Sequence, residues 1–296
     1  MKKFLQKIMH GFHSKTGRAS NIPDAGLEMT FQEQIKKLEA ENASLKQISR
    51  SKDEFIRMTS HEIRTPLDVM RGNIHMVLNG ETGTITKQTE DYLKDALLGA
   101  DRLLRLVSDM LDIARIETGH MKFTLEDIDL ARLIKTFEKE YSSFTRGKQL
   151  KLSVEIEENL PHVYSDNLKV LQILANLIGN ALKFTPSGGY ITIRASVSED
   201  TVAVSIEDSG IGIAHKDIDK LFKRFPEIDS STAGPVKGTG LGLFLSKQIA
   251  DKLGGGIKAE SLGVDKGSTF TFWLPISGTK RAQALQHFHS ILHETS

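Results

Sequence analysis

The residues with the clearest chemical potential are His61 and Glu62, which stand next to each other in the segment SHEIRTPL. Neutral imidazole is a usable nucleophile near its unperturbed pKa of about 6.5. A neighbouring carboxylate can accept the proton of one ring nitrogen and leave the other free to attack. Thr65 shares the face of His61 on a helix, and Pro66 should bend that helix just past the histidine. Thr65 also stands where a zinc protease would have its second histidine, which excludes that reading.

A second group of polar residues recurs on a strongly helical segment, at Asn176, Asn180 and Lys183. Their spacing brings all three to one face of the helix. Amide oxygens suit Mg²⁺, and a lysine suits a phosphate as a point charge. The alternative is a solvated helix face, but the apolar residues around these three positions would bury that face.

Two glycine-rich segments follow. Asp208 comes directly after a strand pattern, and its carboxylate can accept a hydrogen bond from an exocyclic amine such as that of adenine, while Gly210 and Gly212 permit close backbone approach. An aromatic and basic patch contains Lys223 and Arg224. A later loop opens a helix, where free N–H groups and the helix dipole favour phosphate; its residues are Gly238, Thr239, Gly240, Leu241 and Gly242. It is neither a dinucleotide fingerprint nor a P-loop.

Long helices must carry the histidine. A 4-3 spacing of core positions predicts a parallel coiled coil, with a single amphipathic helix as the alternative; the positions are Phe31, Ile35, Leu38, Asn42, Leu45, Ser49 and Ile56. The helix should continue to about Leu78. A second helix over Thr86–Glu117 repeats the spacing at Leu93, Leu97, Ala100, Leu104, Val107, Leu111 and Ala114. Two such helices form an antiparallel hairpin, and two hairpins bury their stripes as a four-helix bundle. We therefore predict a homodimer through the hairpin and the coiled coil.

Mixed helix and strand patterns follow the hairpin and predict an α/β sandwich. The helices are expected at 130–144, 166–184 and 241–253, and the strands at 151–156, 163–164, 190–197, 202–207, 257–260 and 268–274. The stretch from Ser277 reads as a solvated tail. A metal site of His287, His289 and His293 is the alternative for that tail.

These motifs together resemble the sensor histidine kinases of two-component systems. SHEIRTPL is similar to the H-box, and the four later segments are similar, in order, to the N, G1, F and G2 boxes of the ATP-binding domain. Gly267–Phe270, which contains Thr269, resembles the late glycine box. The likeness covers about residues 52–276. It implies a Bergerat or GHKL-type α/β sandwich behind the dimerising hairpin.

The resemblance also implies roles. His61 would take the γ-phosphoryl group of ATP, Glu62 would be the base, and Thr65 would orient water for dephosphorylation of the partner. Asn180 would be the Mg²⁺ ligand, with Asn176 and Lys183 near the phosphates; Asp208 would bind adenine, and residues 225–237 would form a mobile lid. The expected partner is an aspartate on a separate response regulator receiver domain, with a separate sensor protein as a further partner. Where many relatives carry a basic or amide residue in the lid, this chain has Glu227.

The expected domains are a flexible basic lead (1–30), a coiled-coil signalling helix (31–51), the dimerisation and phosphotransfer domain (52–119), the ATP-binding domain (120–276) and the tail (277–296). The net charge of +1 does not indicate nucleic-acid binding, and the chain has no cysteine. No apolar run is long enough to span a bilayer, so we expect a cytoplasmic protein, with a peripheral membrane contact of the lead as the alternative.

Two other functions compete with the kinase. A hydrolytic ATPase of the gyrase, Hsp90 and MutL superfamily would carry a glutamate where this chain has Asn176, and an amide cannot activate water as a base. A dimeric scaffold without activity is the third reading. The intact set of His61, Glu62, Asn180 and Asp208 argues against it.

Overall fold

The computed structural model describes residues 24–226 and 239–294. The lead up to residue 23, Gly238, Glu227 and most of the expected lid lie outside the described residues. The chain divides into two compact units, Met1–Glu54 and Phe55–Ser296. Each unit is described by itself.

Helix α2 (Asp24–Leu78) begins before the coiled-coil seam was expected to start and continues through Pro66 without a break. In its first part, the seam residues Ile35, Leu38 and Leu45 are exposed. Apolar side chains at these core positions need a partner helix to be buried. The coiled coil therefore stays a prediction about an assembly of two chains.

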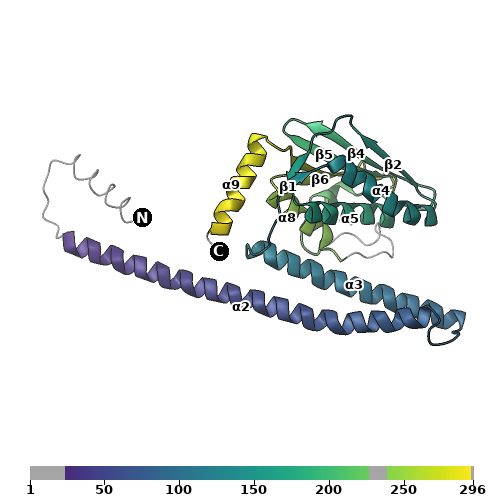
Figure 1. The fold of residues 1–296 in the computed structure, drawn as a ribbon, viewed down its shortest axis with the longest axis horizontal. Coiled ribbons are helices and arrows are strands. Elements are labelled where there is room, and N and C mark those ends of the chain that lie inside the picture. The colour runs from purple at the N-terminus through teal and green to yellow at the C-terminus, as the bar shows by residue number, and fades with distance from the viewer. Residues whose placement is uncertain (1–23, 227–238, 295–296) are drawn as a thin grey trace. The chain divides into compact units, whose positions relative to one another are not determined.

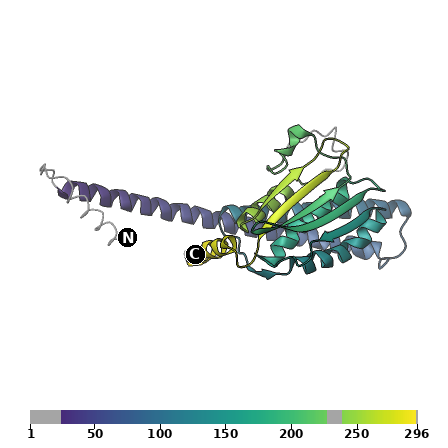
Figure 2. The ribbon, with the colours of Figure 1, turned by 90° about the horizontal axis from the view of Figure 1, so that it is seen from above.

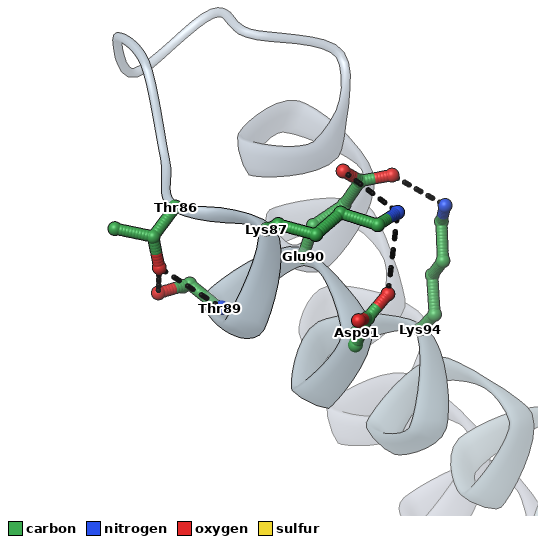
Figure 3. A network of polar contacts seen from close by, with 6 residues as sticks. All are labelled: Thr86, Lys87, Thr89, Glu90, Asp91 and Lys94. Carbon is green, nitrogen blue, oxygen red and sulfur yellow. Dashed lines mark hydrogen bonds and ion pairs between the residues drawn. The ribbon is translucent and has the colours of Figure 1, made fainter.

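Helix α3 (Lys87–Glu117) starts within one residue of the predicted start, with Thr86 as its N-cap. The Thr86 hydroxyl accepts a hydrogen bond from the backbone N–H of Thr89 over 3.2 Å (Figure 3). In the next turn, Lys94 donates to the Glu90 carboxylate, and this hydrogen bond lowers the pKa of Glu90. An acidic residue in the first turn also suits the positive end of the helix dipole. Local contacts thus fix where the second helix of the hairpin begins.

The α/β domain follows, and its elements agree with the predicted order (Figure 1). They are β1 (Glu126–Ile128), α4 (Leu130–Gly147), β2 (Lys151–Ile156), β3 (Val163–Ser165), α5 (Asn167–Phe184), β4 (Tyr190–Ser198), β5 (Thr201–Asp208), α6 (His215–Ile218), α8 (Gly242–Lys252), β6 (Gly256–Glu260), β7 (Ser268–Pro275) and α9 (Lys280–Glu294).

One mixed sheet forms a layer of this domain, with strand order β2-β4-β5-β7-β6 and a single parallel pair, β2 with β4. Alternation along β5 sends Val202, Val204 and Ile206 into the core, where they meet apolar residues of α4, α5 and α8. Phe272 of β7 is fully buried in the same cluster. Figure 2 looks onto the strands from above. The result is the predicted two-layer α/β sandwich.

Three elements were not predicted: β1, the four-residue helix α6 and α9. Strand β1 has only three residues and pairs with β3, a partner far away in the sequence. Helix α9 occupies the expected solvated tail, but Ala282, Leu285 and His289 on it are buried. His289 contacts the backbone carbonyl of Lys252 at 3.3 Å. None of the helices in the described ranges combines the length and the apolar character needed to cross a membrane.

Candidate nucleotide and phospho-acceptor sites

His61 projects from α2 with 78% of its side chain exposed, as predicted. Ser60, which directly precedes it, and Leu67 further along the helix are buried. The histidine therefore faces away from the packed side of the helix. Glu62 places a carboxylate oxygen 3.8 Å from Nδ1 of His61. A small rotation would bring these two atoms into hydrogen-bond range. The Thr65 hydroxyl donates to the backbone carbonyl of His61 over 3.0 Å.

Asp208 lies at the end of β5 and is buried. Its two carboxylate oxygens accept hydrogen bonds from the backbone N–H of Gly210, at 2.8 Å, and from the Ser268 hydroxyl, at 2.5 Å. Burial raises the pKa of Asp208, and these hydrogen bonds oppose the rise. The carboxylate is thus held in one orientation, with lone pairs left for a further donor.

Two glycines in this region have no room for a side chain. A Cβ on Gly210 would lie 2.5 Å from the carboxylate of Asp208 and 2.6 Å from the carbonyl oxygen of Phe184. Gly212 has φ +64°, and a Cβ there would lie 2.0 Å from the carbonyl oxygen of Gly263. The backbone around Asp208 is therefore packed as closely as glycine permits.

Thr269 was predicted to bind the nucleotide, and that contact stays a prediction. Ser268 is the residue whose hydroxyl binds Asp208. Successive side chains of a strand point to opposite faces, so Thr269 faces the other side of β7. The motif was found, but sequence spacing alone did not decide which of two adjacent hydroxyl residues points at the carboxylate.

The polar face of α5 meets the start of α8. The amide of Asn176 donates to the Ser246 hydroxyl over 2.8 Å. A Cβ on Gly242 would lie 2.3 Å from the Asn176 amide oxygen, so only glycine lets α8 approach this closely. Asn180 lies half-buried one turn further along α5. The two amides therefore line the edge where α8 begins.

Lys183 extends the same face of α5. Burial lowers the pKa of its ammonium, and so do the nearby positive charges of Arg102 and Arg105 on α3. Its Nζ lies 4.5 Å from the centroid of the Phe184 ring. An anion beside Lys183 would relieve this repulsion between like charges.

The loop before α8 suits a phosphate. The first turn of α8 contains no acidic residue, and Leu241 at its N-cap provides no side-chain cap. Gly240 has φ +72°, and its carbonyl accepts a hydrogen bond from the backbone N–H of Phe225. The Thr239 hydroxyl accepts from the N–H of Leu241 over 3.4 Å. The backbone donors at the positive end of the helix are thus placed where an anion could bind them.

Arg224 contacts the helical hairpin. It forms an ion pair with Glu117 of α3, and its guanidinium lies 4.9 Å from the centroid of the Phe244 ring. Lys223, its neighbour, is exposed. The predicted nucleotide contact of Lys223 and Arg224 stays a prediction, because the structure uses Arg224 to join the hairpin to the α/β domain.

Two family models match the chain, one over the helical hairpin and one over most of the α/β domain. Residues 51–119 match the His Kinase A (phospho-acceptor) domain. Residues 165–278 match the Histidine kinase-, DNA gyrase B-, and HSP90-like ATPase. His61 falls within the first match, and Asn176, Asp208 and Thr239 fall within the second.

The chain belongs to the sensor histidine kinase family. It is 34% identical over 261 residues to the Non-motile and phage-resistance protein of Caulobacter vibrioides, which is 85% of this chain and 31% of that protein. It is 34% identical to Sensor histidine kinase WalK of Bacillus subtilis, over 77% of this chain and 37% of WalK. It is 35% identical to the Aerobic respiration control sensor protein ArcB of Escherichia coli, over 88% of this chain and 32% of ArcB. The chain thus spans about a third of the length of these curated relatives.

Solved structures of histidine kinases share the fold. Full-length ShkA in complex with AMPPNP superposes with a TM-score of 0.61 at 28% identity, over 75% of this chain and 46% of ShkA. The histidine kinase AdeS of Acinetobacter baumannii gives a TM-score of 0.52 at 26% identity, over 74% of this chain and 98% of the AdeS chain. The helical hairpin followed by an α/β sandwich is therefore the fold of this kinase family.

Three residues that contact the predicted site residues were not predicted from the sequence. Ser246 and Ser268 hold Asn176 and Asp208, and no motif in the sequence singles out a serine for either task. Thr239, in the loop before α8, interacts with Asp109 of α3 and opposes the rise of its pKa, although the two residues lie far apart in the chain. The tail alternative of three histidines gains no support, because His289 is buried against Lys252 and Phe123, and the His293 side chain lies outside the described part.

Proposed function

We propose that the chain is an ATP-dependent protein-histidine kinase that phosphorylates itself on His61. The observation that carries this proposal is the pairing of an exposed imidazole beside a carboxylate with a separate nucleotide site built around Asp208. Adenine would bind the Asp208 carboxylate through its exocyclic amine. The triphosphate would lie between the amides of α5 and the open N–H groups of α8.

The reaction is a phosphoryl transfer. Glu62 accepts the proton from Nδ1 of His61, and Nε2 attacks the γ-phosphorus of ATP. The new N–P bond forms as the bond between the γ-phosphorus and the bridging oxygen breaks, and ADP leaves. Mg²⁺ held by the Asn180 amide oxygen would neutralise phosphate charge when bound. The Asn180 amide oxygen is a ligand of the kind that Mg²⁺ takes, and the Lys183 ammonium would bind a phosphate oxygen directly.

The phosphoryl group would then pass to an aspartate on a response regulator receiver domain. Thr65 would orient water for the reverse hydrolysis on that regulator, and loss of regulator-phosphatase activity in Thr65→Ala would support this role. A homodimer would bring two acceptor histidines into one four-helix bundle. Its support is the set of large apolar side chains that α2 and α3 leave exposed, among them Met70, Tyr92, Leu98 and Met110.

A hydrolytic ATPase is less well supported. Asn176 carries an amide, and its nitrogen already donates to Ser246. An amide cannot accept the proton of an attacking water, so the residue does not serve as a general base. The geometry at this position favours transfer to His61.

The test is incubation of the purified chain with γ-labelled ATP and Mg²⁺, with His61→Gln as the matched variant. We expect acid-labile, base-stable label on the wild type and a loss of about 100-fold or more in the variant. Nucleotide affinity should be the same in both, since His61 lies outside the nucleotide site. Label that persists in His61→Gln would contradict the assignment of the acceptor.

A further inference from the structure

One edge of α3 carries three acidic residues that all reach the ATP-binding domain: Asp109, Asp112 and Glu117, here called the acidic edge. Asp112 accepts a hydrogen bond from the amide of Gln172 over 2.9 Å and lies 3.7 Å from the ammonium of Lys169. Both partners are on α5. This contact ties α3 to the helix that carries the polar face of the nucleotide site.

The other two members of the acidic edge bind groups that belong to the nucleotide motifs. The Asp109 carboxyl interacts with the side chain of Thr239, in the loop that opens α8, and this interaction opposes the rise of the Asp109 pKa. Glu117 pairs with Arg224 of the aromatic and basic patch. Carboxylate and phosphate oxygens are both anionic acceptors of such hydrogen bonds. The acidic edge therefore already satisfies two donors that ATP phosphates would use.

Asp109 is mostly buried at this contact. Burial raises the pKa of its carboxyl to about 6, helped by the charge of Asp112 and opposed by Arg105 and by the side chain of Thr239. At neutral pH the group is therefore an anion beside the loop. The cations that face this region are Arg105 on α3 and Lys169 and Lys183 on α5. A triphosphate placed against Thr239 would meet a negative charge already there.

The acidic edge also lies at a defined position along the axis of the hairpin. Arg71 of α2 lies 3.8 Å from Asp101 of α3, which sets the register of the two antiparallel helices. His61 is ten residues back along α2 and Asp109 is eight residues onward along α3. At the helical rise, both lie about 12–15 Å from that pair in the same direction. The acidic edge thus holds the phosphate loop at the level of the acceptor histidine.

We propose that the acidic edge of α3 is an internal competitor of the nucleotide, in which Asp109 and Glu117 occupy Thr239 and Arg224 until ATP phosphates replace them. This inference rests on the proposed function, because it assigns a competitor to the ATP site. Nucleotide binding then loosens α3 from the ATP-binding domain. Because ATP must break these contacts to bind, the free energy of breaking them lowers its apparent affinity.

The test compares the full chain with Asp109→Asn/Glu117→Gln, which removes both charges and keeps the side-chain shapes. Asp95→Asn is the control, since Asp95 is an exposed acid on α3, about 21 Å before Asp109 along the helix. Affinity for a non-hydrolysable ATP analogue with Mg²⁺ is measured by calorimetry. We expect the double variant to bind about five- to twentyfold more tightly and the control to bind as the wild type does.

Amide hydrogen exchange gives the second readout. Adding the analogue to the wild type should speed exchange in residues 109–117, and the double variant should exchange fast there without nucleotide. Asp112→Asn, which weakens only the α5 contact, should tighten binding by about twofold. Unchanged or weaker affinity in the double variant, or slower exchange in α3 on binding, would overturn the inference.

Labelling with γ-labelled ATP separates the two proposals. If the wild type binds the analogue and labels His61 while the double variant gains nothing, only the competitor role is wrong. If the wild type neither binds nucleotide nor labels, the kinase assignment itself is wrong, and the competitor falls with it.

Discussion

The helical hairpin and the ATP-binding domain bury their apolar residues to very different extents. In the ATP-binding domain, Ile173, Val204 and Phe272 are fully buried against one another. On the hairpin, Tyr92 and Leu98 of α3 are more than 60% exposed. The first region thus has a core of its own, while the second needs a further helix pair to cover its stripe. The comparison separates a part stabilised by one chain from a part stabilised by assembly.

The same difference appears in the chemistry. His61 is usable because it is exposed, and its position follows from the local geometry of α2. Asp208 is usable because it is buried and held by Gly210 and Ser268, which come from other turns and strands. The proposed acceptor is thus on an open helix face, where a phosphoryl donor could reach it. The proposed adenine-binding carboxylate is instead held in one orientation by its neighbours.

The largest expected effect comes from a substitution in the core of the ATP-binding domain. Phe272→Ala should lower the free energy of unfolding of that domain by about 3–5 kcal/mol, because it leaves a cavity among fully buried side chains. The matched change in the hairpin, Leu98→Ala, should cost less than about 1 kcal/mol at dilutions where the chain is monomeric, and more as dimer forms. Urea unfolding at several protein concentrations measures both. Equal, concentration-independent losses would contradict the comparison.

A smaller effect on stability is expected from alanine substitutions of two glycines, one in each region. Gly212→Ala should cost about 1–3 kcal/mol and weaken nucleotide binding, because φ is +64° and the new Cβ would meet the Gly263 carbonyl. Gly99→Ala in α3 should stabilise the hairpin by about 0.5–1 kcal/mol, since nothing lies within 4 Å of the added methyl. Thermal unfolding and calorimetric binding check the pair. A Gly212→Ala variant that binds nucleotide normally would show that close backbone approach is not required there.

The smallest effect on stability comes from Asp208→Asn. Burial raises the carboxyl pKa above its ordinary 3.8, so the unfolded chain ionises first and the wild type loses stability as the pH rises through that interval. The amide lacks this cost, and its stability advantage should therefore grow as the pH rises above about 4. Nucleotide affinity should fall about tenfold or more. Unfolding measured at pH 4 and pH 7 tests the sign, and an advantage that shrinks with pH would contradict it.

Patterns with a local cause were predicted well. The hairpin helices and the strand pair β4 and β5 follow from periodicity and from residues within a few positions of each other. Strand β1 and the buried face of α9 were not predicted, because their stability comes from partners far along the chain. Three residues of strand carry too little pattern to be recognised before the partner β3 is known.

The sequence by itself determined the chemistry available: the imidazole beside a carboxylate at His61, the amides of Asn176 and Asn180, and the glycine loops around Asp208. These depend on residue type and on spacing along one element. Only the tertiary structure decided that Ser268 rather than Thr269 binds Asp208, since strand direction fixes which side chain faces it. It alone placed α3 against the phosphate loop, because a contact between distant residues depends on how whole elements pack.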